Sequence, residues 1–190
     1  MSRAYRISVK ASDTRRLKAA DEIGTTLEIL EILPPEETAA LLREELANRG
    51  FEPQADGTMV RRDGEVTITI DPCSGEVTVK AEATDEVSVE AKSDATGFDD
   101  VGPSEEIIRK QAREQARLEL DKKFDTEQQK LQQQATEELE KHLHDLQPEI
   151  AQIVNKVTRE ALKRKAAQMG EVKEISENDQ TGELTIKLEV

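Results

Sequence analysis

The chain has 190 residues and a formal net charge of −14, with 36% charged and 35% hydrophobic residues. It contains one Tyr, three Phe and no Trp. Because aromatic side chains bury the most area per residue, this composition argues against a single large globular core. The negative field repels phosphate backbones, so we expect no general nucleic-acid binding.

The same counts bear on where the protein works. A single cysteine, Cys73, cannot form an internal disulfide bond, so nothing in the sequence calls for an oxidising compartment. The N-terminal residues lack the apolar run of a signal peptide, and no stretch approaches the roughly 18 apolar residues of a membrane span. We therefore expect a cytoplasmic protein without a membrane span.

The first region combines a strand with a helix. Tyr5, Ile7 and Val9 alternate with polar residues, which is typical of a half-buried strand. Residues 22–33 are apolar and β-branched and fit either a strand or a helix. Pro34-Pro35 opens a helix, because proline is tolerated in a first turn, and the Gly50 that follows Asn48-Arg49 ends it.

The second region, from Gly57 to about Lys92, reads as an antiparallel meander. Its strands alternate apolar and polar residues around Val66–Ile70, Val77–Val79 and Val87–Val89. Residues 93–103 are polar, acidic and contain glycine, so they are expected to form a linker.

Residues 104–170 contain no glycine before Gly170 and predict a long helical arm. Its apolar residues recur mostly every four positions, which does not fit a regular left-handed heptad and favours a right-handed or short local pairing. Pro148 is expected to break or kink the helix near residues 145–147, giving either a kinked rod or a helical hairpin. The partner-binding residues predicted on this arm are Leu131, Leu139, Leu143, Ile150, Ile153 and Val157.

The tail, residues 171–190, predicts a β-hairpin around a turn at residues 178–182. Residues 74–82 and 181–189 match position by position in turn, glycine and strand face. The match is either the common pattern of any hairpin with a glycine turn or a true duplication. Because an isolated two-stranded hairpin is marginal in water, we expect this one to complete the N-terminal sheet, join another chain or bind a partner.

Residues that carry chemistry are few. His142 and His144 face different sides of a helix and cannot share a metal ion, although each has a glutamate four residues before it. Cys73 lies in a turn, and the acids of the linker do not match a calcium loop. We predict no catalytic, cofactor-binding or metal-binding residue. The best candidates for a basic patch that could bind nucleic acid are Arg3, Arg6, Lys10, Arg15, Arg16 and Lys18.

The segments LEILEILPPEETAALLREELANRGFE and DGEVTITIDPCSGEVTVKAE, with the tail VKEISENDQTGELTIKLEV, resemble a known family. They are similar to small accessory proteins of bacterial FtsH ternary systems, which contain an FtsH-type protease, a MoxR-type ATPase and a von Willebrand A protein. The resemblance implies an accessory or adaptor role beside an ATPase machine that handles protein substrates, and it implies no site residues.

Together these features predict an α+β fold. It comprises a small antiparallel sheet domain with one packed helix (residues 1–92), the linker (93–103), the helical arm (104–170) and the C-terminal hairpin (171–190). The predicted function is a non-catalytic adaptor or scaffold subunit that binds an ATPase or protease and forms a homo-oligomer. The alternatives are a holdase-like chaperone and a metal-dependent enzyme subunit with its site in the acidic meander.

Overall fold

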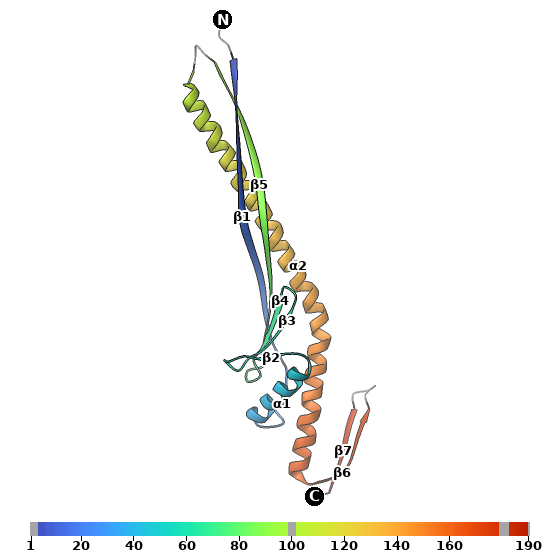
Figure 1. Ribbon diagram of the computed structural model, residues 1–190. Coiled ribbons are helices and arrows are strands. Elements are labelled where there is room, and N and C mark those ends of the chain that lie inside the picture. Colours follow the sequence, from blue (N-terminus) through green and yellow to red (C-terminus); the bar gives the residue numbers. More distant parts are fainter. Residues whose placement is uncertain (1–3, 99–101, 179–182, 190) are drawn as a thin grey trace. The chain divides into compact units, whose positions relative to one another are not determined.

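The computed structural model describes residues 4–98, 102–178 and 183–189 (Figure 1). A five-stranded antiparallel sheet has the strand order β1-β5-β4-β3-β2, and β6 and β7 form a separate two-stranded sheet. The predicted α+β class is therefore confirmed. In chain order the elements are β1 (Ala4–Thr26), α1 (Pro35–Asn48), β2 (Glu52–Pro53), β3 (Met59–Asp63), β4 (Val66–Ile70), β5 (Glu76–Phe98), α2 (Glu105–Met169), β6 (Glu171–Asn178) and β7 (Glu183–Glu189).

The chain divides into two compact units. The first, called here the ribbon unit, comprises Met1–Asp21 and Glu82–Glu137. The second, called the sheet unit, comprises Glu22–Ala81 and Glu138–Val190. Each unit takes one part of β1, β5 and α2, so both are built from segments that are distant in the sequence.

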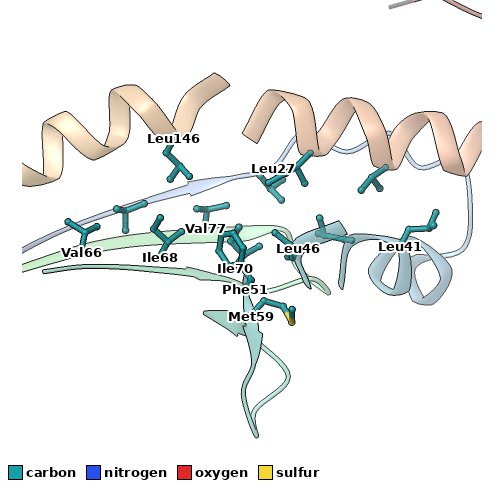
Figure 2. Packing of buried hydrophobic residues seen from close by; sticks show 14 of the residues in the cluster. Leu27, Leu41, Leu46, Phe51, Met59, Val66, Ile68, Ile70, Val77 and Leu146 are labelled. Atoms are coloured by element: carbon teal, nitrogen blue, oxygen red, sulfur yellow. The ribbon is translucent and has the colours of Figure 1, made fainter. Parts of the chain in front are cut away.

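The sheet unit contains the larger core (Figure 2). Val66, Ile68 and Ile70 of β4 are buried, while the threonines between them are only half-buried, so one face of the strand is apolar. β4 pairs with β5 in a register that sets Ile68 against Val79. Helix α1 and the second part of α2 cover this face with leucines, isoleucines and valines, namely Leu41, Leu42, Leu46, Leu139, Leu146, Ile153 and Val157.

Helix α1 begins and ends where the sequence predicts. Pro35 occupies its first turn, followed by Glu36 and Glu37, whose charges suit the positive end of the helix dipole. After the helix, Gly50 has a φ of 81°, which a residue with a side chain rarely adopts, and Phe51 then turns into the core.

The ribbon unit is a two-stranded ribbon of β1 and β5 with the first part of α2 packed on one face. Odd-numbered residues of both strands point toward the helix, as the burial of Ile7, Ala19, Val89 and Ala91 shows. On the helix, the buried apolar residues recur mostly every four positions and face the ribbon. They are Ile108, Ala112, Ala116, Leu120, Phe124, Leu131 and Ala135. The stripe therefore packs on the chain's own strands, and the twist of a two-stranded ribbon suits a stripe that drifts around its helix.

Polar side chains at the sides of α2 bind the backbone of the ribbon. Gln128 and Gln132 donate hydrogen bonds to the carbonyl oxygens of Lys18 and Ala20 in β1, at 2.8 and 3.0 Å. Lys123 donates to the carbonyl oxygen of Glu90 in β5. These two glutamines thus satisfy carbonyl groups of an edge strand that have no partner strand on that side.

Two expectations about where strands end need correction. Residues 22–33 form neither one strand nor a helix: β1 ends at Thr26, and an irregular segment leads to α1. β5 is one strand that continues to Phe98, so residues 93–98 are not a linker, because Ser93 and Gly97 face the ribbon's core in the same alternation. The rest of the expected linker includes residues 99–101, which lie outside the described residues.

Pro148 does not break α2, which runs from Glu105 to Met169, so the helical-hairpin alternative is wrong. A proline inside a helix costs about 3 kcal/mol because it removes one hydrogen bond and crowds the preceding turn. Leu146 and Ile153 pack in the core on either side of it, and Ile150 packs partly against that core. Burial of a side chain of this size contributes about 1.5–3 kcal/mol, so the flanking contacts offset the cost.

Gly97 is a position where the packing of the ribbon unit can be tested. A Cβ atom there would lie 2.5 Å from Cζ of Tyr5 and 2.6 Å from Cδ1 of Ile108. We expect Gly97→Ala to lower the free energy of unfolding by about 1–3 kcal/mol, because the rigid Tyr5 ring must move. Chemical denaturation followed by circular dichroism measures the change. Gly24→Ala is the control, since its Cβ would meet only the Val77 oxygen at 4.0 Å; equal stability of the two variants would contradict the packing described.

Candidate functional site

The six residues predicted to bind a partner are part of the chain's own cores. Leu131 lies in the core of the ribbon unit, while Leu139, Ile153 and Val157 lie in that of the sheet unit. Leu143 and Ile150 are partly buried against the same core. The periodicity did identify a buried stripe, but sequence alone could not show that the chain's own strands cover it. Leu131, Leu139, Ile153 and Val157 are therefore buried within the chain itself, whereas Leu143 and Ile150 keep part of their surface exposed.

Ile153→Ala distinguishes a core role from a partner-binding role. Ile153 has no exposed surface, so removing its outer atoms leaves a cavity, and we expect a loss of about 2–5 kcal/mol in the free energy of unfolding. The control is Leu162→Ala on the same helix, because Leu162 is 40% exposed and its truncation should cost under about 1 kcal/mol. Urea denaturation of both variants measures the difference. Unchanged stability of Ile153→Ala would restore the partner-binding interpretation.

A network of charged side chains joins β3 and α1 to α2 within the sheet unit. Arg61 of β3 donates two hydrogen bonds to the carboxylate of Glu149, at 2.7 and 2.8 Å. Its guanidinium also stacks over the Phe51 ring, 4.7 Å from the centroid. The buried Glu45 of α1 accepts a hydrogen bond from Arg49 at 2.7 Å and pairs with Lys156 of α2.

The pKa values of the two glutamates reflect these partners. Burial by itself raises the pKa of Glu45, but Lys156 and Arg49 outweigh it, and the pKa is lowered overall. The hydrogen bonds from Arg61 lower the pKa of Glu149 against a smaller effect of burial, with Arg49 adding to the lowering. Both carboxylates are thus held ionised by paired cations. This arrangement stabilises the seating of α1 and β3 on α2 and gives neither carboxylate the raised pKa of a general acid.

The network predicts a pH dependence of stability. Because the folded pKa of Glu149 lies below the ordinary value of 4.5, its stabilising effect is complete above that pH and is lost as the pH falls further. We expect Glu149→Gln to lower the free energy of unfolding by about 1–3 kcal/mol at neutral pH and to make the decline toward acid shallower. Thermal melts across the acid range measure both effects. The control is Glu140→Gln on the exposed surface of the same helix, and a profile for Glu149→Gln that matches it would refute the assignment.

The β6–β7 hairpin is the first candidate interaction surface. Val172 pairs with Leu188 and Ile175 with Ile186, so the apolar residues share one face. Ile175 is 45% exposed, and Val172, Leu184, Ile186 and Leu188 are half-buried. Lys163 of α2 pairs with Glu177 of β6, which raises the pKa of the lysine and lowers that of the glutamate. An ion pair thus helps to hold the hairpin beside α2, while part of its apolar face stays exposed.

The similarity between residues 74–82 and 181–189 makes this exposure informative. Val77, Val79 and Ala81 of β5 are almost completely buried, because they belong to the core that α1 and α2 cover. The matching residues of β7 are Leu184, Ile186 and Leu188, which are only half-buried. Among the described residues the hairpin joins no third strand, so the expectation that it completes the N-terminal sheet does not hold within this chain.

The second candidate surface is a groove of about 1040 Å³ in the ribbon unit, called here the basic groove. It runs along β1 and the N-terminal part of α2. Its charged lining residues are Arg6, Lys10, Arg109, Arg113 and Glu105. The remaining lining consists of Tyr5, Ile7, Ser8, Val9, Phe98 and residues 102–104. Arg6 and Lys10 were among the candidates for a basic patch; Arg109 and Arg113 were not, because only the fold brings the helix to the strand.

The histidine and cysteine considered for chemistry do not form a common site. His142 lies 4.0 Å from the carboxylate of Glu138, the four-residue pairing that the sequence allows. Cys73 is exposed in its turn, where Arg43 donates to its sulfur at 3.2 Å. Within residues 4–98, 102–178 and 183–189, no group of three or more histidine, cysteine, aspartate or glutamate side chains is placed to hold a metal ion. No helix in the same residues combines the length and apolar character needed to cross a membrane.

Comparison with known families supplies the decisive observation. Residues 1–190, the whole chain, match the family described as FtsH ternary system domain X5. The chain belongs to this family. No curated protein and no solved structure matches it. The resemblance seen in the sequence is thereby confirmed. Membership suggests an accessory role with an AAA+ protease system and protein partners such as its ATPase or protease.

Proposed function

We propose that this FtsH ternary system protein is a non-catalytic adaptor or scaffold subunit that binds a protein of its AAA+ protease system through the β6–β7 hairpin. The observation that carries the proposal is the half-exposed apolar face of that hairpin. A two-stranded hairpin by itself is marginally stable in water. A bound partner stabilises it by adding a third strand or by covering its apolar face.

Two physical features support hairpin docking. Leu184, Ile186 and Leu188 are already half-buried, so a partner that covers them gains roughly half of the 1.5–3 kcal/mol that burial of a fully exposed side chain of this kind contributes. β6 and β7 pair only with each other among the described residues, so their outer edges offer backbone hydrogen bonds to an added strand. Both features suit protein binding, and both are absent from the buried stripe of α2.

A charge placed on either face of β6 tests the proposal. Ile175→Asp puts a carboxylate on the apolar face, whereas Ser176→Asp puts the same charge on the opposite face, where Ser176 pairs with Thr185. We expect Ile175→Asp to weaken binding to the purified ATPase or protease of the same system by at least about tenfold, and Ser176→Asp by less than about twofold. Biolayer interferometry with immobilised ATPase or protease measures both. No binding by the intact chain, or equal weakening by the two variants, would refute hairpin docking.

Light scattering coupled to size-exclusion chromatography tests the scaffold form of the proposal. A concentration-dependent dimer that Ile175→Asp abolishes would assign the hairpin to a second copy of the chain. A monomer that still binds the ATPase or protease would assign it to that protein and favour the adaptor form.

A holdase-like chaperone is the second candidate, favoured by the exposed apolar side chains of Leu30, Leu118 and Met169. A holdase suppresses the thermal aggregation of a client protein without any other component, whereas an adaptor leaves it unchanged. An aggregation assay with citrate synthase therefore separates the two.

A further inference from the structure

The basic groove presents a free strand edge. β1 is the terminal strand of its sheet and has β5 as its one neighbour among the described residues. Six consecutive residues of β1, 5–10, line the groove. Since successive side chains of a strand point to opposite faces, a cavity lined by all six must run along the edge of the strand. Backbone N–H and C=O groups on such an edge can pair with another extended chain.

The charge at this edge is opposite to that of the protein as a whole. Arg6 pairs with Asp94 at 2.8 Å, and Arg109 pairs with Glu105 at 3.0 Å. Lys10 and Arg113 have no acidic partner within the described residues, and both are exposed. Two unpaired cations therefore face a groove in a chain whose net charge is −14.

The two arginines on the helix side of the groove are spaced at an interval that suits an extended chain. Arg109 and Arg113 are one helical turn apart, which corresponds to about 6 Å along the axis. Alternate residues of a β-strand are separated by about 6.6 Å. Acidic side chains at alternate positions of an extended segment match this interval. The exposed ring of Phe98 and the half-buried Tyr5 and Val9 add apolar contacts beside the charges.

From this combination we propose that the basic groove binds an acidic, extended polypeptide segment that adds a strand to the free edge of β1. The backbone of the segment pairs with residues 5–10, and its carboxylates face Lys10 and Arg113. A phosphate polymer would use the cations but not the strand edge. The inference goes beyond the hairpin proposal, because it concerns the ribbon unit and a partner of different chemistry, and neither surface requires the other.

The test uses the full-length chain and a fluorescein-labelled short peptide that alternates Glu and Val. We expect binding in fluorescence anisotropy that weakens as ionic strength rises, since exposed charges are screened by salt. A second peptide with the same sequence and an N-methyl group at every backbone nitrogen keeps every side-chain charge but has no N–H donor on either edge, so it cannot form the ladder. We expect it to bind at least about tenfold more weakly.

Charge reversal locates the site. Lys10→Glu combined with Arg113→Glu should weaken binding of the alternating peptide by at least about tenfold. The matched control combines Lys18→Glu with Lys110→Glu, which changes the net charge equally on the same strand and helix but outside the groove lining. We expect the control to bind within about twofold of the unaltered chain. Circular dichroism of both double variants confirms that the exposed substitutions leave the fold intact.

Three outcomes would overturn the proposal. Equal binding of the N-methylated peptide would show that charge alone acts and that no strand is added. Equally tight binding of oligothymidylate or polyphosphate, lost in Lys10→Glu/Arg113→Glu, would assign the groove to phosphate polymers. A dimer in light scattering that the same double variant abolishes would assign it to a second copy. Ile175→Asp should leave peptide binding unchanged, so failure at the groove and failure at the hairpin are distinguishable.

Discussion

Burial of the one-sided apolar faces of the strands by a single helix is the constraint on which the rest of the structure depends. A sheet with one apolar face must have it covered, and neither β1 with β5 nor the β2–β5 meander can cover its own face. In the ribbon unit the cover comes from residues such as Ala116, Leu120 and Phe124 of α2. In the sheet unit it comes from Leu146, Ile153 and Val157, together with α1.

Ion pairs fix the positions of β3 and α1 against α2. Apolar packing alone specifies which faces meet but is tolerant of small shifts along the helix. The Arg61–Glu149 pair, with two parallel hydrogen bonds, tolerates such shifts far less, because a guanidinium and a carboxylate meet in a fixed geometry. The buried Glu45, held by Arg49 and Lys156, does the same for α1. Glu45 and Glu149 thus have a structural role, because paired cations occupy both carboxylates. In the basic groove and on the hairpin, by contrast, charged and apolar side chains are exposed and can contact a partner.

Local patterns predicted the parts of the fold that depend on neighbouring residues. The helix after Pro34-Pro35, the strand at Val66–Ile70 and the hairpin at the tail follow from alternation, proline and glycine. Long-range contacts decided the rest. The alternating segments around Val77–Val79 and Val87–Val89 are parts of one strand, β5, which runs on to Phe98 and so takes in part of the expected linker. Leu131 and Ile153 were predicted to be buried by a partner, and only the tertiary fold shows that strands of the same chain bury them. Arg109 and Arg113 meet Lys10 for the same reason.

The glutamine contacts on β1 have a consequence for self-association. Gln128 and Gln132 occupy the carbonyl groups of Lys18 and Ala20, so the strand edge is already hydrogen-bonded there by neutral amides. An exposed edge of 23 residues would be a template for indefinite β-stacking and fibril growth. Blocking one part of it limits any added strand to the remaining stretch. The edge can thus accept a short segment, while the two glutamine amides block the stretch at Lys18 and Ala20 and so limit polymerisation. No additional charged residue is needed there to prevent it.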